Sequence, residues 1–383
     1  MNVAVVAPCP VPYAVGGAEN LWRGLQDALN ASGEHQAEII KLPSPEHNSA
    51  SLLDSYRRFS ELDLSGFDVV VSGKYPAWMV HHPRHVCWML HRLRGLYDSY
   101  HFFGLPDTYP DAPAPVIELR AWMDEHAGEH AALGEFFERV GALQRAPGLP
   151  ADLFAFPGPF IRELVHYLDG VGLAPHAIRR YGAIAATVRD RPDYFPDGAE
   201  VFVAHPPTSL SGLRPRRGSY LFTASRLDPP KRIDLVIRAM EHVTADVQLL
   251  VAGGGPQADE LAALASGNPR VRMLGRVSDA QLARLYGGAR AVAFVPYAED
   301  YGYVTLEAML CGVPVVTTTD SGGPTELVDH GVNGLIAEPE PHALAAAVDR
   351  LWHNRRERWR MSRAARERAR RVTWDAVLKE VLA

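Results

Sequence analysis

Two series of short apolar runs, each run separated from the next by a longer amphipathic stretch, constrain the fold of this chain most strongly. The first series, between residue 2 and about 205, contains VAVVAP, AEIIKL, DVVVSG and HVCWML. The second, between 219 and about 365, contains SYLFTA, VQLLVAGG, AVAFVP and PVVTTT. Such alternation is typical of βαβ units, whose parallel strands are buried on both faces. We therefore expect an α/β protein with two Rossmann-like sheets.

The length of the chain also favours two domains. With 383 residues it exceeds the roughly 250–300 residues at which a single core usually stops growing. The segment HPPTSLSGLRPRRGS, at 205–219, has the Pro, Ser, Gly and Arg content of a linker. We predict an N-terminal domain over 1–207 and a C-terminal domain over 216–371. Residues 96–180 interrupt the first series with loops and helices, and whether they contact a substrate stays open.

Composition and charge restrict the class of function. A net charge of −6 argues against a nucleic-acid surface as the main function. The three cysteines lack any Cys-x-x-Cys spacing, which favours a reducing compartment over a disulfide framework or zinc site. The opening residues lack a basic leader, and no run of 18 apolar residues occurs, so we expect a cytoplasmic protein. Segment 355–371 carries nine arginines and two glutamates, which we interpret as a solvated helix face in preference to an anionic-membrane or acidic-partner surface.

Two glutamates, Glu299 and Glu307, stand in the most informative stretch, YAEDYGYVTLEAMLCGVPVVTTTDSGG. We expect AVAFVP to end a strand, Gly302 to permit a sharp turn, and Glu307 to lie in the first turn of the next helix. In a continuous helix the two carboxylates would be ~12 Å apart, beyond the ~5–9.5 Å of a hydrolase acid/base pair. They would suit two parts of one long ligand, such as a ribose and a hexose. The alternative is a pair of surface glutamates near a helix start.

Arg226 and Lys231 follow another expected strand, in FTASRLDPPKRIDLVIRAM, just before a helix. Two cations there could clamp a diphosphate and stabilise charge on a departing group. Solvated surface cations are the alternative.

Several strand ends carry further candidates. Gly16 and Gly17 follow the first strand, and Gly254 follows VQLLVA; each would let the backbone approach a ligand, or serve only as a turn glycine. His91 ends the strand HVCWMLH, at the edge of the sheet where ligands bind in open α/β folds. The histidines at 81, 82 and 85 lack a helical i, i+4 pair, so we interpret them as surface residues and predict no metal site.

The segment EDYGYVTLEAMLCGVPVVTTTDSGGPTELVDHGVNGLIAEP resembles the retaining glycosyltransferases of family 4, the group 1 glycosyl transferases, which have the GT-B architecture of two Rossmann-like domains facing a central cleft. The resemblance covers nearly all of 219–383 and, in the first half, 1–31, 68–91 and 178–207. It implies that Glu299 contacts the donor sugar and Glu307 the nucleotide ribose. The family has Pro-Phe where this chain has Asp300-Tyr301, and KG where it has Lys231-Arg232.

The same resemblance assigns roles to the other candidates. Arg226 and Lys231 would hold the diphosphate, and His91 would lie near the reactive carbon of the donor. The other residues that it places against the nucleotide sugar are Gly16, Gly17, Gly254, Val277, Tyr301, Gly302, Tyr303, Val304 and Thr305. The closing segment 372–383 would pack back on the first domain.

For chemistry, the resemblance implies transfer of a hexose from a UDP- or GDP-linked donor to a hydroxyl acceptor, with retention of configuration. The donor's departing phosphate oxygen would accept the proton, so no cofactor and no protein base are expected. The chain has no Asp-x-Asp motif, hence we expect no metal ion. The acceptor could be a small molecule, a glycan or a lipid-linked compound, and the oligomeric state is open. A GT-B sugar-nucleotide epimerase and a catalytically silent binding protein remain alternatives, whereas the missing G-x-G-x-x-G fingerprint disfavours a dehydrogenase.

Overall fold

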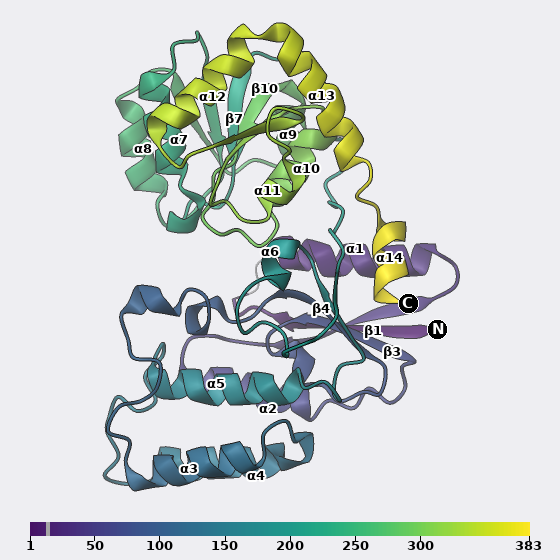
Figure 1. The fold of residues 1–383 in the computed structure, drawn as a ribbon, viewed down its shortest axis with the longest axis vertical. Coiled ribbons are helices and arrows are strands. Elements are labelled where there is room, and N and C mark those ends of the chain that lie inside the picture. Colours follow the sequence, from purple (N-terminus) through teal and green to yellow (C-terminus); the bar gives the residue numbers. More distant parts are fainter. Residues whose placement is uncertain (13–15) are drawn as a thin grey trace. The chain divides into compact units, whose positions relative to one another are not determined.

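The computed structural model of the protein describes residues 1–12 and 16–383 (Figure 1). Its contacts divide the chain into two compact units. Unit 1 comprises Met1–Ile184, Val188–Ala204 and Val377–Ala383. Unit 2 comprises Ala185–Thr187 and His205–Ala376. The end of the chain therefore clusters with the first unit, and the main change of unit falls at the start of the Pro-rich segment.

Unit 1 is built on a parallel sheet of six strands in the order β2-β1-β3-β4-β5-β6. The strands are β1 (Asn2–Cys9), β2 (Gln36–Pro43), β3 (Val69–Lys74), β4 (His85–His91), β5 (Arg180–Ala183) and β6 (Val201–Val203). Val3 to Ala7 of β1 are all fully buried, as expected for a strand covered on both faces.

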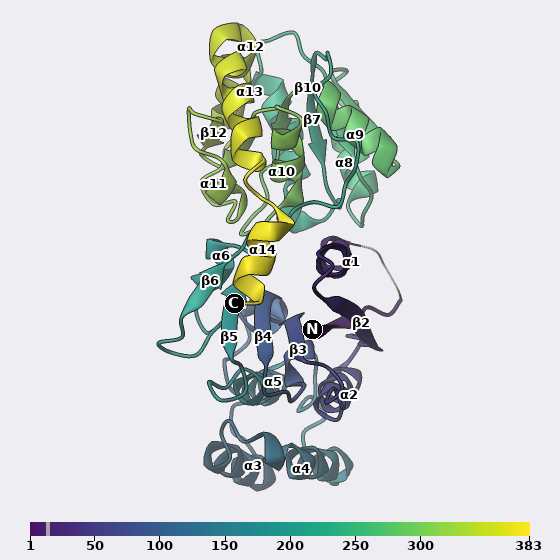
Figure 2. The ribbon, with the colours of Figure 1, turned by 90° about the vertical axis from the view of Figure 1, so that its right-hand side faces the viewer.

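Helices cover both faces of this sheet. They are α1 (Gly17–Ala31), α2 (Ser49–Ser60), α3 (Ala114–Glu125), α4 (Leu133–Arg145), α5 (Pro159–Gly172) and α14 (Trp374–Val381), with the short α6 (Ala186–Arg189) at the unit boundary. Figures 1 and 2 show α1 on one face, α2 and α5 on the other, and α3 and α4 as a further layer below α2 and α5. The expectation that 96–180 forms helices and loops is confirmed.

Unit 2 is built on a second parallel sheet of six strands, in the order β12-β11-β10-β7-β8-β9. Its strands are β7 (Tyr220–Ala224), β8 (Leu249–Ala252), β9 (Val271–Gly275), β10 (Ala289–Ala293), β11 (Val315–Thr318) and β12 (Gly334–Ala337). From the central pair β7 and β10, the chain builds outward in both directions. Such a reversal of strand order is the topological switch point at which open α/β sheets bind ligands.

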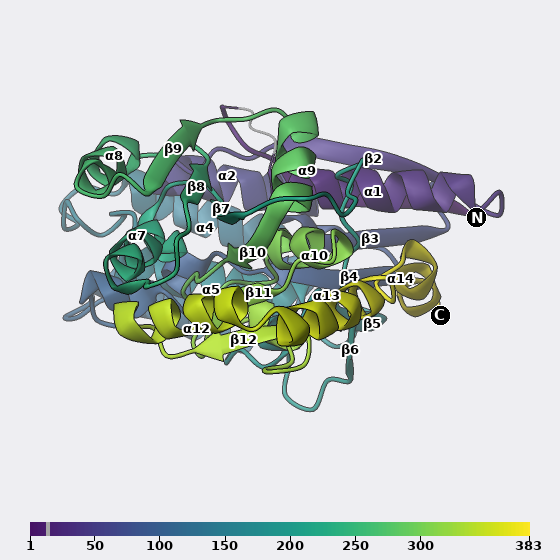
Figure 3. The ribbon, with the colours of Figure 1, turned by 90° about the horizontal axis from the view of Figure 1, so that it is seen from above.

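The helices of unit 2 connect these strands. They are α7 (Ile233–His242), α8 (Ala258–Ser266), α9 (Asp279–Gly288), α10 (Tyr303–Leu310), α11 (Pro324–Leu327), α12 (Pro341–His353) and α13 (Arg355–Ala369). The core gathers Val236 and Met240 of α7, Leu249 and Val251 of β8, and Val348 of α12. Figure 3 shows α12 and α13 following one another along the β12 side of the unit. Two Rossmann-like sheets, as the apolar runs predicted, are thus present.

A buried polar cluster ties the carboxyl end of β4 to the helices of unit 1. The Asp169 carboxylate of α5 accepts hydrogen bonds from Tyr56 Oη at 2.9 Å, Trp78 Nε1 at 2.8 Å and Tyr97 Oη at 2.8 Å. Arg92 Nη1, just after β4, lies 3.8 Å from Asp169 Oδ2. Burial raises the pKa of Tyr56 and of Tyr97 well above the usual value, so both phenols remain neutral donors.

Removing the charge of Asp169 should therefore destabilise unit 1. Asp169→Asn leaves the buried guanidinium of Arg92 without its counter-charge, and we expect a loss of about 3–5 kcal/mol in the free energy of unfolding, measured by urea titration. The matched control is Asp54→Asn, since Asp54 pairs with Arg57 at a site where both side chains are about half exposed, 48% and 50%. That change should cost less than about 1 kcal/mol. Equal effects of the two changes would contradict the role given to Asp169.

Candidate functional site

Lys231 and Glu299 form an ion pair at the switch point of unit 2. Lys231 ends the 3-10 helix Pro229–Lys231 after β7, and Glu299 lies on the loop after β10. Lys231 Nζ donates a hydrogen bond to Glu299 Oε2. The two side chains are 20% and 21% exposed, so the pair is accessible from solvent. The structure thus brings together two predicted site residues at the sheet edge where a ligand is expected.

The backbone of Glu299 is held by the loop that follows β11. Glu299 N donates to Ser321 O at 2.9 Å, and Gly323 N donates to Glu299 O at 2.9 Å. A Cβ atom on Gly322, whose φ is +74°, would lie 2.5 Å from Glu299 O. One on Gly323 would lie 2.6 Å from the Cα of Tyr301. The glycine pair is therefore required for the close approach of two backbones, which places the carboxylate of Glu299.

Arg232 holds the loop that carries Lys231, the cation of the ion pair. It has a φ of +48°, a conformation that glycine adopts without strain. Its guanidinium donates to both carboxylate oxygens of Asp320 at 2.7 and 2.8 Å and to Pro296 O at 2.7 Å. The hydrogen bonds from Arg232 hold the pKa of Asp320 below its usual value. Arginine at this position, where the family has glycine, is thus used as a clamp between the β7 and β11 loops, next to Lys231.

Glu307 lies on α10, with its carboxyl group buried. It is 8% exposed, and Oε1 accepts a hydrogen bond from Thr208 Oγ1 at 2.7 Å. The hydroxyl of Tyr286 also hydrogen-bonds to it. Burial raises the pKa of Glu307 from 4.5 to about 7, against the lowering effect of these hydrogen bonds.

The position of Glu307 in its helix differs from the prediction. Gly302, with a φ of +80°, precedes the helix, which begins at Tyr303, so Glu307 lies in the second turn and the expected first-turn position was wrong. The sharp turn expected at Gly302 is confirmed. A Cβ there would lie 2.6 Å from Phe294 Cε1, so space as well as φ requires glycine.

The residues between the two glutamates pack into unit 2. The Tyr301 ring stacks on His205 with centroids 5.5 Å apart, and meets the Tyr303 ring edge-on at 5.4 Å. The hydroxyls of Tyr301, Tyr303 and Thr305 are buried polar groups with no hydrogen-bond partner among the described residues. Val304 is half-buried. The tyrosine in place of the family's phenylalanine therefore adds a buried hydroxyl to this loop.

Arg226, Gly254 and Val277 follow the ends of β7, β8 and β9. The Arg226 side chain is 75% exposed, and its Nε donates to Asp228 Oδ2 at 2.5 Å. Gly254 O accepts a hydrogen bond from Leu227 N at 3.1 Å, which joins the first two loops. Val277 is half-buried, two residues after β9. These residues extend the line of candidates along the carboxyl edge of the sheet from Glu299.

The remaining candidates belong to unit 1. Gly16 precedes α1 and Gly17 is its first residue, both exposed, while residues 13–15 of the same glycine loop lie outside the described residues. His91 is the last residue of β4; its Nδ1 lies 2.8 Å from Arg92 O, and its ring meets Tyr75 edge-on at 5.7 Å. His91 stands at the carboxyl end of a unit 1 strand, as predicted, whereas Gly16 and Gly17 lie seven and eight residues after the end of β1, at the start of α1. Their grouping with the unit 2 residues around one donor stays a prediction.

The interpretation of the three histidines as surface residues was wrong for two of them. His82 is 7% exposed and His85 is fully buried, with Nε2 of His85 2.7 Å from Ser72 Oγ. Burial lowers the pKa of His85 to about 3, so it is neutral. Within residues 1–12 and 16–383, no group of three or more His, Cys, Asp or Glu side chains is arranged to hold a metal ion.

Sequence reasoning missed the partners of the site residues. Thr208 comes from the segment assigned to the linker and Tyr286 from α9, both far along the chain from Glu307. Asp320 immediately precedes the Ser-Gly-Gly of the recognised motif, which was the available signal for the Arg232 clamp.

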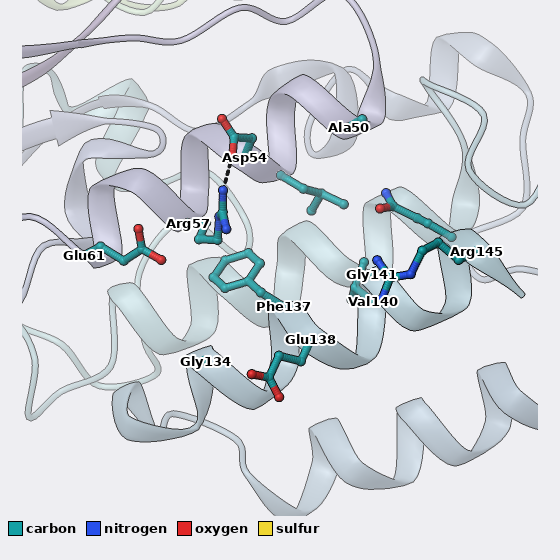
Figure 4. Close-up of a pocket in the computed structure, with 12 residues that line it drawn as sticks. Ala50, Asp54, Arg57, Glu61, Gly134, Phe137, Glu138, Val140, Gly141 and Arg145 are labelled. Atoms are coloured by element: carbon teal, nitrogen blue, oxygen red, sulfur yellow. Dashed lines mark hydrogen bonds and ion pairs between the residues drawn. The ribbon is translucent and has the colours of Figure 1, made fainter.

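A cavity of about 540 Å³ in unit 1 lies apart from every predicted site residue (Figure 4). It separates α2 from α4, and its lining includes Asp54 and Arg57 of the first helix and Phe137 and Glu138 of the second. A second cavity, of about 570 Å³, lies between α3 and α5 and includes Arg120 and Glu163 in its lining. Both belong to the helical layer and not to a strand edge.

Comparisons with known proteins agree with the motif. A family model for "Glycosyl transferases group 1" matches residues 211–368. A D-inositol 3-phosphate glycosyltransferase of Xylanimonas cellulosilytica is 32% identical over 298 residues, which cover 70% of this chain and 70% of that relative. Relatives with the same name from Salinispora tropica and Mycobacterium marinum are each 33% identical over 44% and 49% of this chain. Those matches span only 38% and 45% of the two relatives' own lengths.

Solved structures show the same fold at low sequence identity. The Anabaena protein HepE in complex with UDP-glucose superposes with a TM-score of 0.64 and 16% identity, covering 100% of this chain and 98% of that one. Sucrose-phosphate synthase of Thermosynechococcus elongatus also gives 0.64 at 16% identity, covering 98% and 96%. The predicted GT-B fold class is confirmed.

The buried carboxyl of Glu307 should make stability depend on pH. In the unfolded chain it ionises near 4.5 and in the folded protein near 7, so unfolding releases a proton between these values and stability falls as pH rises. Relative to Glu307→Gln, which cannot ionise, the wild type should lose roughly 3 kcal/mol between about pH 5 and about pH 8.5. Urea unfolding at both values measures this. Any constant cost of the amide cancels in the comparison, and curves that stay parallel would rule out a raised pKa.

Proposed function

The chain belongs to the group 1 glycosyl transferases, and from this membership we propose that it transfers a hexose from a nucleoside diphosphate sugar to a hydroxyl acceptor. We further propose that it does so with retention of configuration and without a metal ion. The observation that supports this most is the Lys231–Glu299 pair at the switch point of unit 2, with the carboxylate of Glu307 on the helix that follows.

The ion pair suits a ligand that carries both phosphates and hydroxyls. Diphosphate oxygens would accept hydrogen bonds from Lys231 Nζ in place of Glu299, and sugar hydroxyls would donate to the carboxylate that is released. Both charges are therefore in position before the donor arrives, and each gains a new partner when it binds. Arg226, with its side chain 75% exposed, could turn toward the same phosphates by exchanging its ion pair with Asp228 for them.

Glu307 would receive the ribose of the nucleotide. Thr208 and Tyr286 orient its carboxyl group, and an ionised carboxylate has further lone pairs for vicinal hydroxyls. Because the pKa of Glu307 is raised to about 7, its accepting form is more populated as pH rises above that value.

In the proposed reaction the bond between the anomeric carbon and the phosphate oxygen breaks as the acceptor oxygen attacks from the same face. The acceptor's proton passes to the departing phosphate oxygen, so the protein need not supply a base. Arg226 and Lys231 stabilise the charge that grows on this oxygen, an effect worth about 3 kcal/mol for a preorganised donor. The chain has no Asp-x-Asp motif, which supports the assignment of this role to cationic side chains.

The choice of first substrates follows the relatives. HepE was crystallised with UDP-glucose, so UDP-linked hexoses are the first donors to test. Several relatives are named D-inositol 3-phosphate glycosyltransferases, so a phosphorylated cyclitol is the first acceptor to test.

We also propose a cytoplasmic location, which the three free cysteines support.

Donor binding tests the proposal directly. One of UDP, GDP and dTDP should raise the thermal unfolding temperature, since a ligand at 100 times its Kd stabilises by about 2.7 kcal/mol. Glu307→Ala should abolish most of that shift and raise the donor KM steeply, because it removes the ribose acceptor. The matched control is Glu241→Ala, an exposed acid on α7, which should change neither. No shift with any of the three nucleotides would refute the proposed function.

The chemical step is tested through Arg226. Arg226→Ala should lower kcat on the order of 100-fold, because the guanidinium acts on the leaving phosphate, and kcat is compared at a temperature where thermal unfolding shows the variant fully folded. Arg238→Ala, on the exposed side of α7, is the control and should retain full activity.

The product and the metal requirement complete the test. NMR of the first product formed should show the anomeric configuration of the donor, and chelation with EDTA should leave the rate unchanged. Inversion, or loss of activity that Mg²⁺ or Mn²⁺ restores, would overturn the respective part of the proposal. Isomerised sugar formed from the donor alone would indicate an epimerase instead.

A further inference from the structure

One side of α13 carries a strong positive charge. Six arginines and one tryptophan, all exposed or half-buried, fall within about 140° of the helix circumference, at about 100° per residue. They are Arg355, Arg356, Trp359, Arg360, Arg363, Arg366 and, directly after the helix, Arg370, hereafter the α13 arginine face. The acid Glu367 lies in the same sector. The opposite side, with Met361, Ala365 and Ala369, is buried against unit 2.

Few acids neutralise this face within the part of the chain that the structure describes. Glu357 pairs with Arg350 of α12 at 2.6 Å and lies 4.0 Å from Arg360 of the face, and Glu367 pairs with Arg371 at 3.2 Å. Arginines four residues apart, such as 356 and 360 or 366 and 370, repel each other and weaken the helix. A helix face that served only solubility would mix both signs of charge. The charge is therefore concentrated at a cost to the helix.

A large aromatic side chain lies within the basic face. The side of the helix that holds the arginines also exposes Trp359, which is 62% accessible to solvent. The guanidinium of Arg363 lies 5.1 Å from the centroid of its ring. Beside them is a hollow of about 430 Å³ lined by Arg363, Arg366, Arg370 and Arg371, together with Glu367. The hollow is of a size to admit an anionic headgroup, and guanidinium groups bind phosphate oxygens in a bidentate manner.

We propose that the α13 arginine face docks the protein on an anionic lipid bilayer. The charge of the face complements the negative surface of acidic phospholipids, to which each arginine adds roughly a fivefold factor in affinity. A tryptophan among the arginines is suited to the boundary between headgroups and acyl chains, whereas a nucleic-acid duplex or a soluble polyanion offers no apolar layer to receive it.

Docking through this face is peripheral. Among the described residues no helix is both long and apolar enough to span a bilayer. The remainder of the chain is acidic, since the net charge is −6 although segment 355–371 holds nine arginines and two glutamates. The attraction is thus confined to one face, which orients the protein on the surface. This inference does not depend on the proposed function, and it would hold for a protein with another activity.

Vesicle sedimentation tests the proposal. The full chain should bind vesicles of phosphatidylcholine with about 30 mol% phosphatidylglycerol at about 0.1 M NaCl, and not vesicles of phosphatidylcholine alone. Arg356→Gln/Arg363→Gln/Arg370→Gln should weaken binding on the order of 100-fold, because three arginines are removed from the face. The binding of the wild type should fall steeply at about 0.5 M NaCl, where screening is stronger.

A second triple variant controls for the loss of total charge. Arg238→Gln/Arg272→Gln/Arg284→Gln removes the same charge from exposed sites of unit 2 outside α13, and it should bind vesicles like the wild type. Circular dichroism and the shift caused by the nucleotide that the wild type binds should be unchanged in both triple variants. Equal weakening by the two variants would show that only net charge matters and would overturn the inference.

Trp359→Ser distinguishes a bilayer from a soluble polyanion. It should weaken vesicle binding and leave retention on a heparin column unchanged, since only the bilayer receives the indole ring. Retention on heparin without binding to anionic vesicles would overturn the proposal in favour of a polyanionic partner. Absence of binding to both would leave the arginines as a solvated face and would refute it.

Discussion

Backbone pairing between the loops that follow β10 and β11 is the constraint on which the unit 2 site depends. Glu299 lies outside any strand, yet its N–H and C=O are both bonded to the Ser-Gly-Gly segment at 2.9 Å. Two glycines make this possible, because a Cβ at either position would collide with the opposing backbone. The same contact orients the carboxylate toward Lys231 from the neighbouring loop. A side-chain interaction at the switch point is thus set by main-chain geometry, which is stiffer than a rotamer.

Arg232 shows how a departure from a family pattern can be accommodated. A positive φ at a non-glycine residue costs energy that the surrounding structure must recover. At Arg232 this energy is offset by the hydrogen bonds of the guanidinium, which donates to both carboxylate oxygens of Asp320 and to Pro296 O. From the sequence alone, Lys231-Arg232 is a modest departure from the family's KG. In the structure one faces the candidate ligand edge and the other braces the loop.

The elements and the positions of the candidates could be predicted from the sequence, whereas burial and partners could not. Apolar runs with a helical stretch between them are local signals, so His91, Arg226 and Gly254 were placed at strand ends correctly. Burial depends on what packs over a residue from elsewhere. His85, the first residue of β4, is covered completely, although its histidine-rich neighbourhood suggested a surface position, and Glu307 is bonded to Thr208 across 99 positions of the chain. No spacing rule contains that information.

The charges of the candidate site are balanced in pairs, and this decides how it can remain ready for a ligand. Lys231 and Glu299 are each about one-fifth exposed, so either alone would have lost much of its hydration, but the ion pair compensates both. Burial raises the pKa of Glu307 to about 7, and among the described residues its hydrogen-bonding partners, Thr208 and Tyr286, are neutral and do not offset this burial. An anionic ligand with hydroxyls offers each of these groups a complementary partner at once. A ligand with the hydroxyls but without the phosphates would offer Lys231 no anion. Its hydroxyls would have to compete with the existing Lys231–Glu299 ion pair for the carboxylate.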